Sequence, residues 1–171
     1  MVRVNVNELL SDAFGRLPAL VRSAVAGLDA EQLRRPPAPG ANTVGWLVWH
    51  LTRIQDDHVA ELIGDEQIWV TGPWAPRFGL AADPDDTGYA HGPEQVLAVR
   101  PESGKVLVDY YEAVHARTAA LLEAVTEEDL SRIVDRSWDP PVTMGVRLVS
   151  VLGDDLQHVG QAAYVRGVLL A

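Results

Sequence analysis

The chain carries an acidic and an imidazole side chain at helical spacing near its C-terminus. Asp154 and His158 are four residues apart, and residues at this spacing lie on one helix face with their Cβ atoms about 5 to 6 Å apart. Val151 and Ala162 share this face, so the stripe is otherwise apolar. Because an unpaired buried charge costs several kcal/mol, the two side chains must satisfy each other or share a cation.

His50 is a third candidate ligand, in the densest apolar run of the chain, VGWLVWHL. Helix bundles build metal sites from side chains that project inward from facing helices. Two imidazoles and one carboxylate, with water completing the shell, suit Zn(II), Ni(II), Fe(II) or Mn(II) and leave a position for chemistry. We therefore expect His50, Asp154 and His158 to bind one divalent metal ion, with Zn(II) or Ni(II) favoured.

A structural interpretation stays open for each of these residues. A single His on an apolar helix face is more often a hydrogen-bonded core residue than a metal ligand. Asp154 and His158 are equally compatible with a hydrogen bond on the helix surface, where Asp155 on the neighbouring stripe is a competing carboxylate. The spacing by itself does not decide between a metal site and a structural role.

The other histidines are weaker candidates. His58 lies eight residues after His50, about 80° around the helix, and we expect it at a solvated rim, as the reserve ligand. Exposure is the expectation for His91, in a loop, and for His115, in an Ala-rich helical turn.

The helix that carries His50 has clear boundary signals. Apolar residues recur at helical spacing over residues 44–63. Asn42 or Thr43 supplies an N-cap oxygen, and Gly64 is suited to the left-handed position after the last turn. A helix of about five turns or more is predicted here.

Three further segments show the same periodicity. The first covers residues 4–28, where Pro18 should kink the helix or start a second segment. The others are residues 101–125, opened by Pro101, and the segment that begins after the N-cap Thr143 and runs nearly to the C-terminus. Four such segments without a convincing strand pattern predict an all-α four-helix bundle, formed by a single domain over residues 1–171.

The second and third predicted helices are separated by a long irregular loop, residues 65–100. A connection of this length is often a functional lid or binding loop, although a loop that merely covers one end of the core is an equal alternative. Four aromatic side chains make it too apolar for a solvated linker, and we expect them to pack over the bundle: Trp69, Trp74, Phe78 and Tyr89.

Composition excludes several functional classes. The net charge of −10 disfavours binding to nucleic acid. No stretch approaches the roughly 18 to 20 apolar residues that a membrane span requires, and the first residues do not resemble a signal peptide. The chain has no cysteine, which excludes disulfides and thiolate ligands and suits a reducing compartment. We expect a cytoplasmic protein without membrane or nucleic-acid partners.

Two segments, NTVGWLVWHLTRIQDDHVAEL and DDLQHVGQAAYVRG, resemble the DinB/YfiT-like superfamily of metalloenzymes. Its signature is a His in a WHL-like setting and a late His-x-x-x-His followed by an x-Gly-Gln step. His50 matches the first His, His158 the last, and Gly160-Gln161 the Gly-Gln step. Asp154 stands where the usual middle ligand is His, although the mycothiol-dependent isomerase branch has a carboxylate there.

The resemblance implies a divalent metal that activates a low-molecular-weight thiol. Its members include bacillithiol transferases and the N-terminal domain of mycothiol-dependent maleylpyruvate isomerase. The composition is rich in Ala, Val and Arg and suggests a high-GC bacterium, which favours mycothiol. The leading hypothesis is a thiol-dependent transferase or isomerase of small electrophiles, in which Gln161 and Arg166 orient a substrate carboxylate. Helix packing and a solvated charge are the alternatives for these two residues.

Two other functional hypotheses stay open. The same metal could activate water in a hydrolase. Alternatively, the chain is a non-catalytic, stress-related helical bundle that serves binding or dimerisation. A homodimer is compatible with each hypothesis, because bundles of this kind often pair through an apolar helix face.

Overall fold

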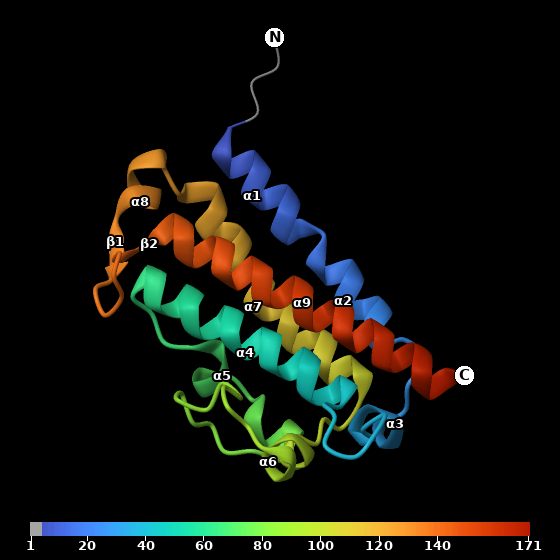
Figure 1. The fold of residues 1–171 in the computed structure, drawn as a ribbon. Coiled ribbons are helices and arrows are strands. Elements are labelled where there is room, and N and C mark those ends of the chain that lie inside the picture. The colour runs from blue at the N-terminus through green and yellow to red at the C-terminus, as the bar shows by residue number, and fades with distance from the viewer. Residues whose placement is uncertain (1–4) are drawn as a thin grey trace.

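The computed structural model describes residues 5–171, and long helices dominate it (Figure 1). The first helical segment is divided into α1 (Val6–Gly15) and α2 (Leu17–Val25). The other three are α4 (Val44–Ile63), α7 (Gly104–Ala124) and α9 (Met144–Leu170). These four segments form the predicted four-helix bundle.

The division of the first segment follows from Pro18. This residue lies in the first turn of α2, where a missing backbone N–H leaves no helical hydrogen bond unmade. Asn5 caps α1 by accepting a hydrogen bond from the backbone N–H of Glu8. The predicted helix start at Val4 lies outside the described residues.

Both predicted boundary signals of α4 are confirmed. The Thr43 hydroxyl accepts a hydrogen bond from the backbone N–H of Trp46 at 3.0 Å, and Gly64 has the left-handed φ of 70°. Most residues of α4 are buried, because the helix packs against both α9 and α7. α2 completes the bundle by packing against the same two helices.

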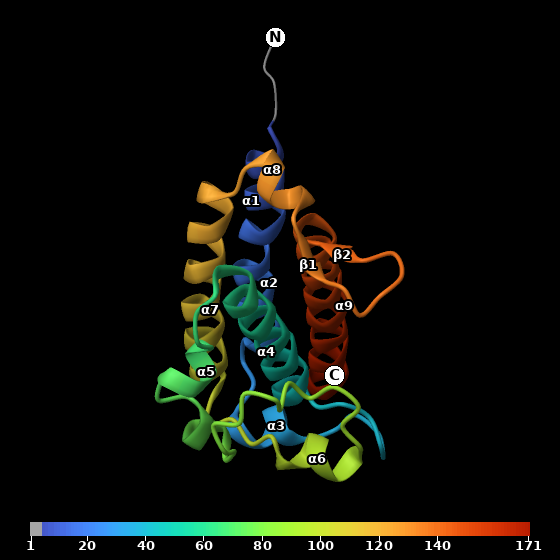
Figure 2. The same cartoon turned by 90° about the vertical axis from the view of Figure 1, so that its left-hand side faces the viewer.

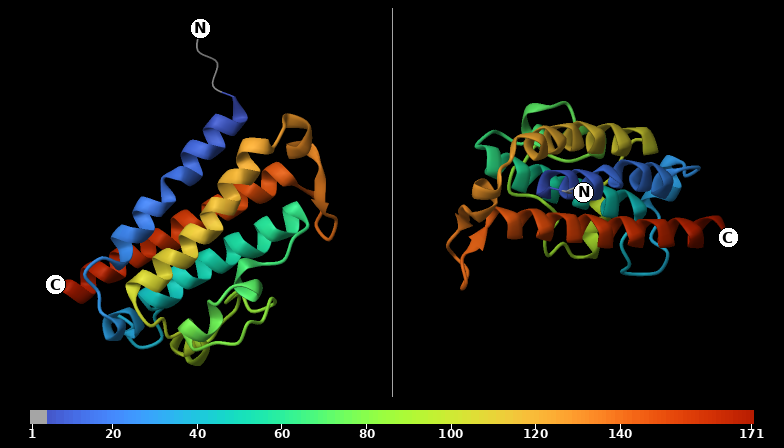
Figure 3. Two further views of the ribbon diagram at one scale, coloured as in Figure 1. Left: turned by 180° about the vertical axis from the view of Figure 1, so that it is seen from behind. Right: turned by 90° about the horizontal axis from the view of Figure 1, so that it is seen from above.

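The helix directions explain the long connection after α4. α4 and α7 run in the same direction, and the α1–α2 segment and α9 run opposite to them (Figures 1 and 3). The chain must therefore return along the whole bundle between α4 and α7. A helix of 20 residues such as α4 spans about 30 Å, which a short turn cannot cross.

The connection is more ordered than the sequence predicted. It contains three short helices: α5 (Ile68–Thr71), the 3-10 helix η1 (Ala75–Phe78) and α6 (Pro93–Ala98). They lie over one side of α4 and one end of the bundle (Figure 2).

The loop aromatics mostly pack as expected. Trp69 and Phe78 are fully buried, and Trp74 is half-buried against the core. The expectation was wrong for Tyr89, which is 85% exposed. It lies within the turn that the hydrogen bond from the His91 N–H to the Gly88 carbonyl closes.

The remaining connections contain short elements. α3 (Ala30–Arg34) precedes α4, and α8 (Glu127–Ser131) follows α7. β1 (Ile133–Asp135) and β2 (Val142–Thr143) then form a two-stranded antiparallel ribbon, which the sequence pattern did not indicate.

The third helix begins later than predicted. Ser103, rather than Pro101, caps α7. By contrast, Thr143 caps α9 as predicted, with its hydroxyl accepting from the backbone N–H of Val146.

Two observations concern the outer surfaces of the helices. Among residues 5–171, no helix is both long enough and apolar enough to cross a membrane. The outer face of α9 exposes apolar side chains such as Val149 and Leu156. The homodimer stays a prediction.

Candidate metal centre

Helices α4 and α9 bring the three predicted ligands together. One potential ligand atom each from His50, Asp154 and His158 lies within 4.8 Å of the other two. His50 is buried, and the other two residues are half-buried. Within the described part of the chain, no other group of three acidic or imidazole side chains has this arrangement.

His50 is held in one ring orientation. Its Nδ1 lies 2.6 Å from the carbonyl oxygen of Thr87, and because a carbonyl only accepts, Nδ1 carries the proton. Nε2 is then left with a free lone pair for a metal ion. Trp46 stacks on the imidazole with ring centroids 4.6 Å apart and an interplanar angle of 10°.

Gly88 permits the close approach of the loop to His50. It has a φ of +87°, and a Cβ at this position would lie 2.8 Å from both His50 Nδ1 and a ring carbon of Trp49. A larger residue would therefore be strained and would collide with the imidazole. The Thr87–His50 contact depends on this glycine.

His158 is oriented in a similar way from within its own helix. Its Nδ1 lies 3.1 Å from Gln161 Oε1, so Nδ1 donates to the amide oxygen and Nε2 is left unprotonated. That Nε2 is 3.5 Å from Asp154 Oδ1. The rings of His50 and His158 meet edge to face, with centroids 4.7 Å apart.

The two imidazoles have opposite pKa shifts. Burial is the main effect at His50 and lowers its pKa, against a smaller opposing effect of the Thr87 hydrogen bond. At His158 the main effect raises the pKa: the Asp154 carboxylate accepts a hydrogen bond from Nε2 once the ring is protonated. Without a metal ion, His50 therefore favours the neutral form, and His158 gains a proton more readily.

A buried arginine anchors the loop that reaches His50. Arg53, one turn after His50 on α4, is fully buried. Its guanidinium donates to the backbone carbonyls of Asp83, Pro84 and Asp86. Because Thr87 follows directly, this anchor fixes the carbonyl that orients His50.

Asp56 balances the charge of that arginine. Its carboxylate lies 3.7 Å from Arg53 and accepts hydrogen bonds from the backbone N–H groups of Ile68 and Trp69. The hydroxyl of Tyr110 donates to it at 2.8 Å. Asp56 thereby joins α4, α5 and α7.

His91 was wrongly expected to be exposed. Its side chain is only 8% exposed, and its Nδ1 accepts a hydrogen bond from Trp46 Nε1 at 3.2 Å. Nε2 then carries the proton and pairs with Asp86 at 2.9 Å. His91 thus supports the aromatic ring that stacks on His50. No sequence signal indicated this, because the contact joins residues 45 positions apart.

The other two histidines stay outside the cluster. His58 occupies a partly solvated position, as expected, with 23% of its side chain exposed and with Arg147 at 3.3 Å from Nδ1. His115 is less exposed than predicted: it stacks on Tyr111, and its Nδ1 is buried without a partner.

The two predicted substrate-orienting residues have different positions. Gln161 contacts His158, at the edge of the candidate centre. Arg166 instead donates from Nε to the carbonyl of Ala26 at 2.6 Å. Its guanidinium is thereby engaged at the C-terminal end of α2 and is not brought to the cluster.

Asp155 does not compete with Asp154 for the centre. It is fully buried, and neither carboxylate oxygen has a hydrogen-bond partner within residues 5–171. Burial, and secondarily the charge of Asp154, raises its pKa well above the usual value. Asp155 therefore points into the bundle core and favours the neutral form.

The donor set fits a divalent ion. Each imidazole is held by a hydrogen bond from its Nδ1, so that its Nε2 lone pair is free, and one ring nitrogen of each lies within 4.8 Å of a carboxylate oxygen of Asp154. Such outer hydrogen bonds are typical of metal-ligating histidines. In addition, Asp154 Oδ2 is buried without a hydrogen-bond partner among the described residues, and a cation would satisfy it.

The fold and this cluster define a four-helix bundle with a candidate metal centre between α4 and α9. Residues 13–162 match the family model described as the DinB superfamily. The chain belongs to this superfamily.

Solved structures support the fold. A conserved protein from Enterococcus faecalis superposes with a TM-score of 0.89 at 32% identity, covering 98% of this chain and 99% of that one. YfiT from Bacillus subtilis superposes with a TM-score of 0.66 at 17% identity, covering 96% and 90% of the two chains. That structure is described as a candidate metal-dependent hydrolase with an unusual four-helix bundle topology.

One curated relative comes from Geobacillus kaustophilus (strain HTA426) and is named as a candidate metal-dependent hydrolase. It is 34% identical over 118 residues, which cover 69% of this chain. The matched region spans 60% of the length of that relative.

Proposed function

We propose that the protein is a metal-dependent hydrolase whose divalent ion is held by His50, Asp154 and His158. The observation that carries the proposal is the convergence of the three side chains within 4.8 Å. The names of the Geobacillus relative and of YfiT support the same class of reaction. Zn(II) or Ni(II) suits two imidazoles and a carboxylate.

Each residue of the centre has a defined task in this proposal. Nε2 of His50 and of His158 and the carboxylate of Asp154 hold the ion. Thr87 and Gln161 keep both imidazoles in the tautomer that binds metal. When bound, such an ion lowers the pKa of a coordinated water or thiol, so that the nucleophilic anion exists at neutral pH.

The neighbouring side chains control access of water to the centre. Trp46 covers one face of His50 and meets the His158 ring edge-on, with centroids 6.1 Å apart. The half-buried positions of Asp154 and His158 leave the other side accessible. A small substrate would approach from that side.

Thiol transfer, which the family resemblance implies, uses the same centre with a different nucleophile. It stays a prediction, as do mycothiol as the thiol and a small electrophile as the substrate. The chain contains no cysteine, so the thiol would be supplied from solution. The non-catalytic bundle is the remaining alternative.

One assay distinguishes these three functions. Protein freed of metal with a chelator is reconstituted with Zn(II) or Ni(II) and incubated with carboxylic esters, with or without mycothiol. Metal-dependent formation of acid and alcohol in water alone supports the hydrolase. A thiol adduct formed only with mycothiol would replace it with a transferase, and no turnover in either condition would favour a binding protein.

Matched variants connect turnover to the centre. His158→Ala is expected to reduce turnover to the level of the metal-free protein. His58→Ala, which removes a histidine of the same helix pair outside the cluster, should retain it. Equal loss in both variants would contradict the assignment.

A further inference from the structure

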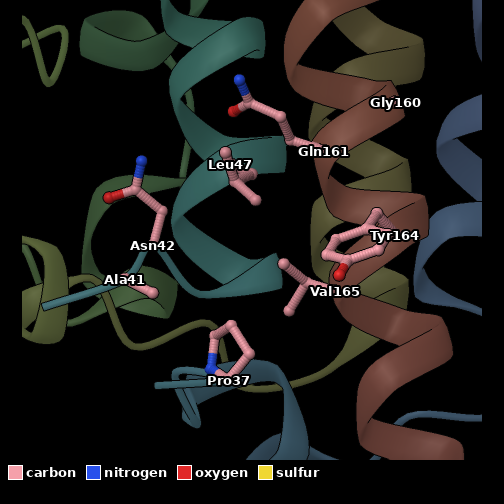
Figure 4. Close-up of a pocket in the computed structure, with 8 residues that line it drawn as sticks. All are labelled: Pro37, Ala41, Asn42, Leu47, Gly160, Gln161, Tyr164 and Val165. Atoms are coloured by element: carbon pink, nitrogen blue, oxygen red, sulfur yellow. The ribbon is translucent and has the colours of Figure 1, made fainter. Parts of the chain in front are cut away.

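A pocket of about 500 Å³ opens along the groove between α4 and α9 (Figure 4). Pockets of this size are typical for small-molecule ligands. Eight residues line it: Pro37, Ala41, Asn42, Leu47, Gly160, Gln161, Tyr164 and Val165.

The pocket adjoins the candidate metal centre through two lining residues. Gln161 accepts a hydrogen bond from the His158 imidazole at 3.1 Å, so one side chain belongs to both the centre and the pocket. Leu47 precedes His50 by about one helical turn on α4. A molecule in the pocket would therefore reach toward the three candidate ligands.

The lining contains no formally charged side chain. Its polar groups are the carboxamides of Asn42 and Gln161 and the hydroxyl of Tyr164, which donate and accept hydrogen bonds but neutralise no charge. The other surfaces are apolar, with Leu47 and Val165 extending between the two helices (Figure 4). A charged group moved from water into such surroundings lacks a counter-charge and is disfavoured.

A second pocket, elsewhere on the molecule, has a charged lining. About 580 Å³ lie between α3 and the end of α6, where the lining includes Arg34, Arg35 and Arg100. The chain thus gathers cationic side chains elsewhere and places none in the pocket beside the centre.

We propose that the pocket beside the centre binds the uncharged, mostly apolar acyl group of a neutral ester or amide, whose carbonyl lies toward His50 and His158. This inference rests on the proposed hydrolase function and adds the class of substrate. Hydrolysis consumes one water: its oxygen bonds to the carbonyl carbon, the bond to the leaving oxygen or nitrogen breaks, and the leaving group takes a proton.

Gly160 gives a direct way to fill the pocket. A Cβ added at Gly160 meets no atom within 4 Å, and the same holds for Gly167 seven residues later on α9. Gly160 lines the pocket, but Gly167 does not. Gly160→Leu therefore occupies the pocket, and Gly167→Leu is a matched control with the same gain in helix propensity.

Binding is measured by calorimetry with two probes of similar shape. Butyranilide is a neutral anilide, and succinanilic acid is its carboxylate analogue. We expect butyranilide to bind the wild type and Gly167→Leu, and Gly160→Leu to weaken binding by about tenfold or more. Succinanilic acid should bind the wild type about tenfold more weakly than butyranilide. Metal content should be equal in all three proteins.

The proposal is overturned if Gly160→Leu binds butyranilide as tightly as Gly167→Leu, if the carboxylate probe binds better, or if neither probe binds the wild type. Hydrolysis of p-nitrophenyl butyrate by the metal-loaded proteins provides the separate test of the reaction. Loss of the expected binding pattern with metal-dependent hydrolysis intact refutes the pocket alone. Intact binding without any hydrolysis refutes the hydrolase and leaves the pocket as a neutral-ligand site.

Discussion

The two ends of the α4–α9 helix pair each present a histidine of α4 to the facing helix, with different results. At one end, His50 meets the carboxylate of Asp154 and the imidazole of His158. At the other, His58 meets the guanidinium of Arg147, which also pairs with Asp135 at 3.0 Å.

Burial lowers the pKa of both α4 histidines, and Arg147 lowers that of His58 further. Arg147 therefore supplies a positive charge beside His58. The groups that face His50 are instead the His158 imidazole and the Asp154 carboxylate. A histidine on a buried helix face does not define a metal site. Whether such a histidine belongs to a metal site depends on the groups that the neighbouring helix places opposite it.

The largest expected effect comes from removing the anchor of the loop at the His50 end. Arg53→Met breaks the buried pair with Asp56 and leaves the carbonyls of Asp83, Pro84 and Asp86 without their donor. Breaking a buried pair typically costs about 3 to 5 kcal/mol, so the free energy of unfolding should fall by that amount in urea titration. Arg117→Met, which removes a more exposed pair with Asp65, should cost about 1 kcal/mol or less. Equal losses would contradict the anchoring role.

A smaller effect is expected from Gly88, which permits the contact between Thr87 and His50. Gly88→Ala introduces a Cβ that collides with the imidazole, and disturbing such an outer contact typically costs about 10- to 100-fold in metal affinity. Calorimetric titration with Zn(II) measures the change.

Gly79→Ala is the matched control for backbone strain. Gly79 also has a left-handed φ, of +72°, but its added Cβ would make only an ordinary contact at 3.7 Å. This variant should keep wild-type metal affinity. If both variants bind Zn(II) equally well, the loop contact does not orient His50.

Asp155 provides a comparison within α9, because it adjoins Asp154 but points into the core. The pKa of its carboxyl group is raised in the folded protein. The protein is therefore most stable below the pKa that this carboxyl has in the unfolded chain, and it loses stability as the pH rises toward the pKa in the folded protein. In metal-free protein, the free energy of unfolding of the wild type should fall between about pH 4 and pH 8 by about 1 to 3 kcal/mol more than that of Asp155→Asn. Urea unfolding at several pH values measures this, and parallel pH profiles would show that Asp155 carries no such penalty.

How much the sequence could predict depended on how local each signal was. Thr43 and Gly64 bound α4 as predicted, because capping depends on the few residues around each helix end. Asp154 and His158 were found by their four-residue spacing. His50 required the further assumption that α4 and α9 face each other.

Contacts made across the long connection were not predictable. His91 and Gly88 acquire their roles because the loop folds back onto α4, and nothing in their neighbouring residues specifies that return path. The contact of Arg166 with the end of α2 was also not predictable, because a helical position gives the direction of a side chain around the axis but not its partner. Tyr89 lies in a turn of this loop, and its ring is exposed although it is largely apolar.

The most direct test of the central claim is the metal content of three metal-reconstituted variants. The wild type should bind about one divalent ion per chain, and His50→Ala and His158→Ala should each lose it. His58→Ala should retain it, because Arg147 rather than a metal ion faces that imidazole. Stoichiometric metal in both His50→Ala and His158→Ala would contradict the proposed centre.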